Sequence, residues 1–185
     1  MQAKEQAALK GVYTITIADV VTKEARRLMA MIEGYRERGD DPRQMKRLID
    51  ILNRDYGHKP IVVENLIPTV GRSVLAQRLA NTSTYTGIIN KVALGTGSTP
   101  PANGDTRLTT EVYRNNASSL TYANNVAYIT GFFTAAECNG TYNEAGLFID
   151  GAAGANTGQL FSHVLVSVSK SSVQTLTIDW TLTIN

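Results

Sequence analysis

Hydrophobic residues recur with a helical period in the first half of the chain and with a two-residue period in the second half. Within 22–38 and again within 42–56, apolar residues recur every three or four positions, which places them on one face of a helix. These positions are Ala25, Leu28, Met29, Ile32 and Tyr35, then Met45, Leu48, Ile49, Leu52 and Tyr56. The pattern predicts two amphipathic helices that form an antiparallel hairpin.

Capping residues mark the ends of these helices. Gly39 is a natural stop for the first helix, and Asp41 before Pro42 is a good N-cap for the second. We expect Gly57 to end the second helix in a left-handed conformation. A third helix is predicted over 68–80, although Gly71 should weaken it by about 1 kcal/mol relative to alanine.

Alternating apolar and polar residues predict strands. Residues 12–17 alternate, and the partner of this strand lies either in the second half of the chain or in another subunit. After residue 85 the two-residue period continues, with strands predicted over 86–94, 125–133, 142–149, 160–168 and 173–184. In the last of these, apolar side chains including Trp180 alternate with threonines. We expect it to be a central strand with Trp180 in the core and a hydroxylated opposite face, and we expect the strands together to expose mostly threonine, serine and asparagine.

These elements predict an α+β fold: an N-terminal helical hairpin and a third helix, followed by a C-terminal antiparallel β-sandwich or open barrel. The predicted organisation is an N-terminal arm with a short strand (1–21), a helical docking region (22–84) and a β-domain (85–185). The first ten residues are polar and uncapped, as in an arm that is mobile or ordered by a partner.

Charge is distributed unevenly. Most of the 18 basic and 16 acidic residues lie before residue 81, so the strands are nearly uncharged. Free edges of such strands favour aggregation, and assembly with other copies would cover them. No apolar run approaches the roughly 20 residues of a membrane span, and the N-terminus lacks the apolar centre of a secretory signal. We expect a soluble protein that is used without export.

Few residues suggest chemistry. The glycine-rich stretch 95–99 lacks the lysine ending of a phosphate loop, so we interpret it as a turn in which glycines supply positive φ and Pro100 adds stiffness. The single Cys138 excludes an internal disulfide, and His58 and His163 are too few for a zinc cluster. We interpret Cys138 as a buried or idle thiol and His163 as a sheet-surface residue whose side chain points away from that of Ser162.

The acidic residues of the second half could supply a carboxylate pair for glycoside hydrolysis, but we interpret them as turn caps and surface groups. They are Asp105, Glu111, Glu137, Glu144, Asp150 and Asp179. We therefore expect no catalytic residues, no cofactor, no metal and no small-molecule substrate.

Basic residues of the predicted hairpin, among them Arg43, Lys46 and Arg47, could contact phosphates of nucleic acid. Acidic residues are interspersed with them, as on a solvated or protein-docking helix face. We favour the docking face over a nucleic-acid partner.

The motifs ALGTGSTPPANGDTRLTTEVYR, NGTYNEAGLFIDG, GQLFSHV and LTIDWTLTI occur in this order in the second half. This arrangement resembles small structural proteins of tailed bacteriophages and prophages, of the tail, tail-fibre or head-decoration type. The resemblance covers roughly 65–185 and leaves the predicted hairpin out. It implies a non-enzymatic virion component, made in the cytoplasm of a bacterial host, that assembles as a homotrimer or hexamer and docks to other virion proteins.

The resemblance also implies which residues serve packing and subunit or particle contact. They are Gly95, Gly97, Pro100, Asp105, Leu108, Glu111 and Arg114 in the loop, and Glu144, Gly146, Leu147 and Phe148 in the later strand. We expect Glu111 and Arg114 to pair, either with each other or across a subunit boundary.

Two alternatives stay open. One is a DNA-contacting connector or packaging protein that uses the basic residues of the hairpin. The other is a carbohydrate-binding receptor module that uses exposed aromatics such as Tyr122, Tyr128 or Tyr142.

Overall fold

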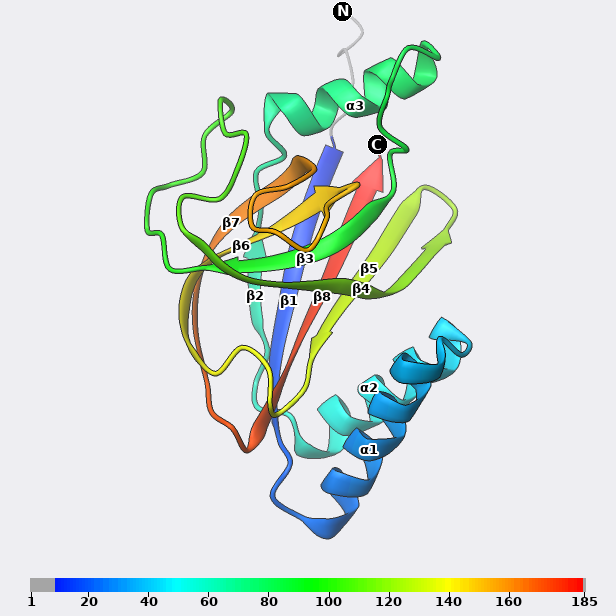
Figure 1. Ribbon diagram of the computed structural model, residues 1–185, viewed down its shortest axis with the longest axis vertical. Helices are drawn as coiled ribbons and strands as arrows, with labels where there is room; N and C mark the ends of the chain where they lie inside the picture. Colours follow the sequence, from blue (N-terminus) through cyan, green and yellow to red (C-terminus); the bar gives the residue numbers. More distant parts are fainter. Residues whose placement is uncertain (1–8, 185) are drawn as a thin grey trace, which may run out of the picture.

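The computed structural model describes residues 9–184, and the first eight residues of the predicted arm lie outside them. Three helices and eight strands follow one another in the described chain (Figure 1). The helices are α1 (Lys23–Arg38), α2 (Pro42–Tyr56) and α3 (Thr69–Leu79). The strands are β1 (Leu9–Asp19), β2 (Ile61–Glu64), β3 (Ile89–Gly95), β4 (Glu111–Ala123), β5 (Val126–Phe133), β6 (Gly140–Ile149), β7 (Gln159–Lys170) and β8 (Gln174–Ile184). The predicted α+β class is confirmed.

All eight strands belong to one antiparallel sheet in the order β2-β1-β8-β5-β4-β3-β6-β7. The sheet curls into a nearly closed barrel, because its two ends meet where Leu66, just after β2, bridges to His163 of β7. Each of these residues donates its backbone N–H to the carbonyl of the other at 3.0 Å. The first strand, whose partner the sequence left open, pairs along its whole length with β8.

The barrel interior is apolar around Trp180 of β8, which is 1% exposed, as predicted. Tyr13 and Phe161 pack against its indole ring. The indole N–H donates to Asn65 at 3.1 Å, and the Tyr13 hydroxyl donates to Ser162 at 3.1 Å. Asn65 also donates to Ser162, so side chains link β1, β7 and β8 across the seam where the barrel closes. Burial raises the pKa of the Tyr13 hydroxyl well above its ordinary value.

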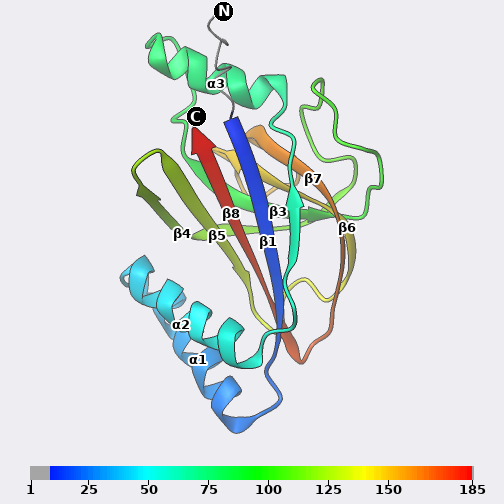
Figure 2. The same ribbon diagram turned by 180° about the vertical axis from the view of Figure 1, so that it is seen from behind.

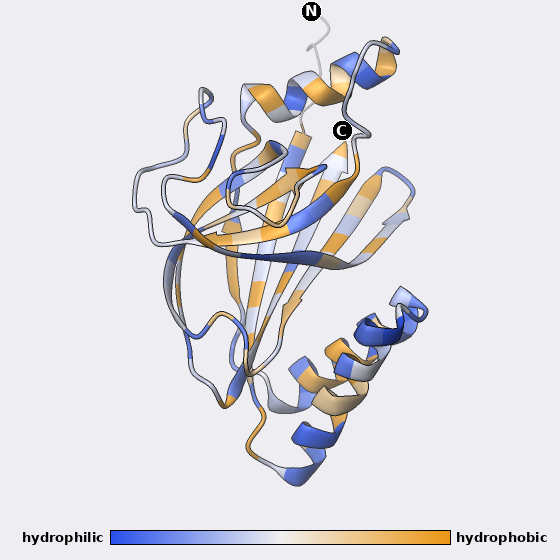
Figure 3. Ribbon diagram, viewed as in Figure 1, coloured by the Kyte–Doolittle hydropathy of each residue, from blue (hydrophilic) through white to orange (hydrophobic). Residues whose placement is uncertain are grey.

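The helical hairpin forms as predicted and packs on the outside of the barrel at one end (Figures 1 and 2). Gly39 ends α1 with a φ of 65°, and Asp41 caps α2 by accepting from the Arg43 backbone N–H at 2.9 Å. Figure 3 shows apolar and polar residues alternating around both helices. Ile32 and Leu52 turn inward and pack with Phe132 of β5.

This packing overturns the expectation of exposed threonines for the first half of the last strand. Thr175 and Thr177 are fully buried, and Thr177 donates to Asn53 of α2 at 3.2 Å. Lys46 of α2 lies 3.3 Å from Asp179 in the same strand. The hairpin therefore covers a polar face of β8 and satisfies it with its own polar side chains.

Glycine roles differ from the prediction at two helix positions. Gly57 ends α2 with a φ of −79° instead of a left-handed conformation. Gly71 allows α3 to lie close to β7, because a Cβ there would lie 2.9 Å from the Phe161 backbone. The loss of helix propensity at Gly71 is thus offset by close packing against the barrel.

The sequence pattern missed β2 and β4 as strands. No strand was predicted between 94 and 125, yet Glu111–Ala123 form the 13-residue strand β4. Its side chains are mostly half-buried or exposed, so it lacks the apolar alternation by which other strands were found.

Phe132→Ala should lower the free energy of unfolding by about 3–5 kcal/mol, because it opens a cavity between the hairpin and the barrel. Val21→Ala is a suitable control, since Val21 is 51% exposed, and should change stability by less than about 0.5 kcal/mol. Urea unfolding measures both. Equal effects of the two substitutions would show that the hairpin does not pack on Phe132.

Candidate functional site

The residues that carry the family resemblance gather at one side of the barrel, where the loop 96–110 joins β3 to β4. The loop begins and ends beside Glu144 of β6, which is fully buried. The backbone N–H groups of Gly97, Thr109 and Thr110 donate to the Glu144 carboxylate at 3.1, 3.0 and 2.6 Å. One carboxylate thus holds both ends of the loop, and its charge is stabilised by three N–H dipoles.

His163 of β7 lies between this carboxylate and the loop. Its Nε2 is 3.0 Å from Glu144 and its Nδ1 is 2.8 Å from Asp105. The imidazole therefore bridges the two carboxyl groups, with one ring nitrogen at hydrogen-bond distance from each. The interpretation of His163 as a sheet-surface residue was wrong, since the side chain is 1% exposed. Its direction away from the Ser162 hydroxyl is confirmed, because Ser162 bonds to Tyr13 inside the barrel.

Glycines in this loop make room for Glu144 instead of adopting positive φ. The glycines with positive φ in the described chain are Gly39, Gly87, Gly140 and Gly158. A Cβ on Gly97 would lie 2.5 Å from the carboxylate oxygen, and one on Gly95 would also collide with Glu144. The glycines are thus needed for close approach to a buried charge.

Other loop residues attach it to the rest of the fold. Leu108 is fully buried with Phe148 and Leu160 on the outer side of the sheet. Asn103 accepts the backbone N–H of Thr69, at the start of α3, at 3.0 Å. Ser98, Thr99 and Pro100 are exposed, so this part of the loop faces solvent in a single chain.

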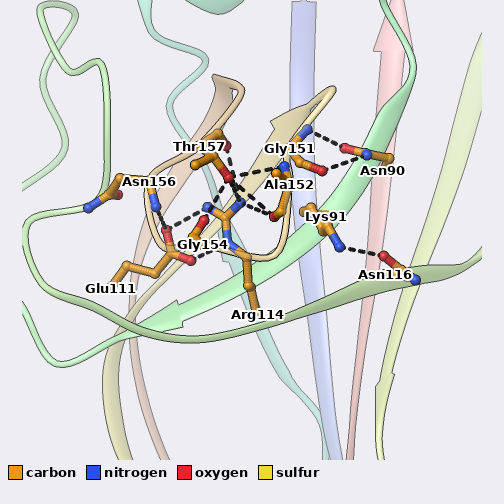
Figure 4. Close-up of polar contacts among 10 residues, drawn as sticks. All are labelled: Asn90, Lys91, Glu111, Arg114, Asn116, Gly151, Ala152, Gly154, Asn156 and Thr157. Carbon is orange, nitrogen blue, oxygen red and sulfur yellow. Dashed lines mark hydrogen bonds and ion pairs between the residues drawn. The ribbon is translucent and has the colours of Figure 1, made fainter.

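A second cluster surrounds Glu111 and Arg114 at the start of β4 (Figure 4). The guanidinium donates to both oxygens of Glu111, at 2.5 and 2.8 Å, so the predicted pair forms within one chain. The side chain of Arg114 is 5% exposed, and that of Glu111 is fully buried. Arg114 also lies over the ring of Phe148, 4.6 Å from its centroid.

This pair holds the loop 150–158 between β6 and β7 (Figure 4). Arg114 donates to the carbonyls of Ala152 and Thr157 at 3.0 and 3.1 Å, and Glu111 accepts the Asn156 backbone N–H at 2.8 Å. Asn90 secures the start of the same loop by exchanging two hydrogen bonds with the backbone of Gly151. Glu111 and Glu144 are therefore buried side chains that hold loops in place. The expectation that they are turn caps or surface groups was wrong.

A third polar group joins the hairpin to the turn between β5 and β6. Arg36 of α1 donates to both oxygens of Glu137 at 2.9 Å. Burial would raise the pKa of Glu137, but the bonds from Arg36 and Thr134 outweigh it and hold that pKa below its ordinary range. In the same turn, burial raises the pKa of the Cys138 thiol to about 12, which leaves it protonated, as expected of an idle buried thiol.

The basic residues considered for docking lie on α2. Arg43 is exposed and 3.4 Å from Asp41, Lys46 pairs with Asp50 and Asp179, and Arg47 is exposed. Acidic partners thus accompany this face.

The three tyrosines considered for carbohydrate binding are not equivalent. Tyr142 is 5% exposed and packs in the barrel core, whereas Tyr122 and Tyr128 lie on the hairpin of β4 and β5, 82% and 40% exposed.

The clusters differ in what they can do chemically. Within residues 9–184, no group of three or more His, Cys, Asp or Glu side chains is arranged to hold a metal ion. Both ring nitrogens of His163 face protein carboxylates, so neither is directed at a substrate. In the described part of the chain, no helix is long and apolar enough to cross a membrane.

No protein-family model, curated protein or solved structure matches the chain. What the geometry provides is two loops held rigidly by buried charges.

Glu144→Gln should destabilise the fold by about 2–3 kcal/mol, because an amide cannot accept from all the donors that face it. Hydrogen exchange should speed up at Gly97, Thr109 and Thr110. Glu37→Gln, at an exposed position of α1, is the control and should leave both unchanged. Unaltered exchange in the Glu144 variant would contradict the anchoring role.

A double-mutant cycle with Glu111→Ala and Arg114→Ala should give a coupling energy of about 1–3 kcal/mol. Each single change leaves a buried charge without its partner, so the two losses are not additive. Alanine suits this test better than a charge swap, which would place a carboxylate against the carbonyls of Ala152 and Thr157. Denaturant unfolding of the four proteins measures the coupling, and additive losses would refute the pair.

Proposed function

We propose that this protein is a non-enzymatic structural component of a tailed-phage particle, which assembles with copies of itself and docks to other virion proteins. The observation that carries the proposal is that the motif residues hold two surface loops in place. Gly95, Gly97 and Asp105 fit the loop to Glu144 and His163, and Glu111 and Arg114 hold a neighbouring loop. The residues of the resemblance thus shape rigid surface loops, which is what a building block of a particle requires.

The two ends of the barrel support a division of roles within the particle. The hairpin end presents charged side chains with intermixed signs, including Arg43 and Asp41 on α2, and suits docking to another protein. The exposed residues 98–100 of the loop 96–110 provide a second contact surface. Three or six copies around an axis would bring such loops onto neighbouring subunits.

Particles induced from the strain that encodes the chain test this proposal directly. The protein should be present in density-gradient-purified particles by mass spectrometry, at a constant ratio to the other virion proteins, and antibodies should label one part of the particle by immunogold microscopy. A protein abundant in the lysate and absent from the purified particles would overturn the proposal. A host cytoplasmic enzyme followed through the same gradient controls for carry-over.

A further inference from the structure

The half of β4 that lies beyond Asn116 has hydrogen-bond partners on one side only. Up to Asn116 the strand pairs with β3, and from Ala117 to Ala123 the register shows pairing with β5 alone. Within residues 9–184 no other strand pairs with this half of β4. Its free backbone groups therefore form an open sheet edge, at the margin of the hairpin seen in Figure 2.

An apolar groove of about 380 Å³ lies beside this edge, where β3 and β4 separate. Its lining includes Leu120 and Tyr122 of β4, Ile88 before β3, and Trp180 and Ile184 of β8. Among the described residues that line it, none is Asp, Glu, Lys, Arg or His. An occupant of this groove must accordingly be apolar and uncharged where it touches the lining.

Exposed apolar side chains concentrate at the rim of the same groove. Tyr122 is 82% exposed, Ile88 56%, Ile184 53% and Leu120 46%. A soluble chain seldom leaves such a contiguous apolar patch uncovered, and patches of this kind mark interaction sites. The edge of β4 also lacks the lysine or proline that protects open strand edges in other proteins, since residues 117–123 read ASSLTYA.

We infer that this edge and groove bind a second copy of the chain, with β4 pairing antiparallel to the β4 of the partner about a two-fold axis. The uncharged rim matches itself, because two copies bring together apolar side chains without opposing like charges. In a two-fold contact the same patch of each copy meets itself, so it must offer both projecting side chains and a groove to receive them. This patch has both, because the exposed apolar side chains lie at the rim of the groove. The contact supplies the missing backbone hydrogen bonds of both edges at once.

This inference deepens the proposed self-assembly and rests on it only in part, since the pairing can be measured on the purified chain. Two-fold contacts occur in a hexamer made of two trimers and not within one trimer. Of the two assemblies that the resemblance implies, the edge thus selects the hexamer.

Light scattering coupled to size-exclusion chromatography, over about 1–100 μM protein, tests the contact in the range where moderate interfaces form. The full chain should show even-numbered assemblies. Leu120→Lys should raise the dissociation constant of the pair at least about tenfold by placing a charge in the apolar rim. Val112→Lys is the matched control, because Val112 is 52% exposed on the half of β4 that β3 already pairs. Thermal melting of both variants shows that the fold persists.

Cysteine cross-linking makes the test specific to the two-fold arrangement. The native Cys138 is 4% exposed, so a cysteine introduced at the edge is the accessible thiol. Leu120→Cys should give a covalent dimer on mild oxidation, and Val112→Cys should not. A chain that stays monomeric throughout, or one whose assembly tolerates Leu120→Lys and gives no cross-link, would overturn the inference. Either result leaves the particle-location experiment to judge the proposed function separately.

Discussion

The pairing of β1 with β8 is the constraint on which the rest of the structure depends. Every residue of β1 from Leu9 to Asp19 has a partner in β8, from Ile184 to Gln174, so the two ends of the described chain run side by side. This ladder closes a loop of almost the whole chain, and its long-range contacts must compensate a large loss of chain entropy. Once it forms, the helical hairpin that follows β1 is held at one end of the barrel, while the lead-in to α3 lies towards the other.

Buried charged side chains hold two loops in place, as backbone hydrogen bonds hold the strands in the sheet. The two loops on this side of the barrel have few backbone partners of their own, and carboxylates inside the protein accept their N–H groups instead. Such charges are stable only because each has several donors, as at Glu144, or a bidentate partner, as at Glu111. Rigid loops of this kind keep a surface in one shape, which suits repeated contacts between identical subunits.

The sequence by itself determined the helices and most of the strands, but not β2 and β4. Period and capping were enough for α1 and α2, because amphipathic spacing and residues such as Asp41 and Gly39 act within a few positions of one another. The helix α3 was predicted from its apolar spacing, although no side chain caps its start. The strict alternation around Trp180 was enough to identify a central strand. The Glu111–Arg114 pair could be expected too, since its partners are three residues apart along the chain.

Only the tertiary structure decided what each face meets. Threonines of β8 look like a solvent face until the hairpin covers them, and Asn53 then supplies the partner for Thr177. His163 and Glu144 acquire their roles from Asp105 and from loop amides that are distant in sequence. The strand β4 pairs with β3 over its first half and with β5 over its second, and most of its side chains are half-buried or exposed, so neither face carries the apolar alternation that marks the other strands. Periodicity reports that two faces differ, whereas the element that covers each face is chosen by long-range packing.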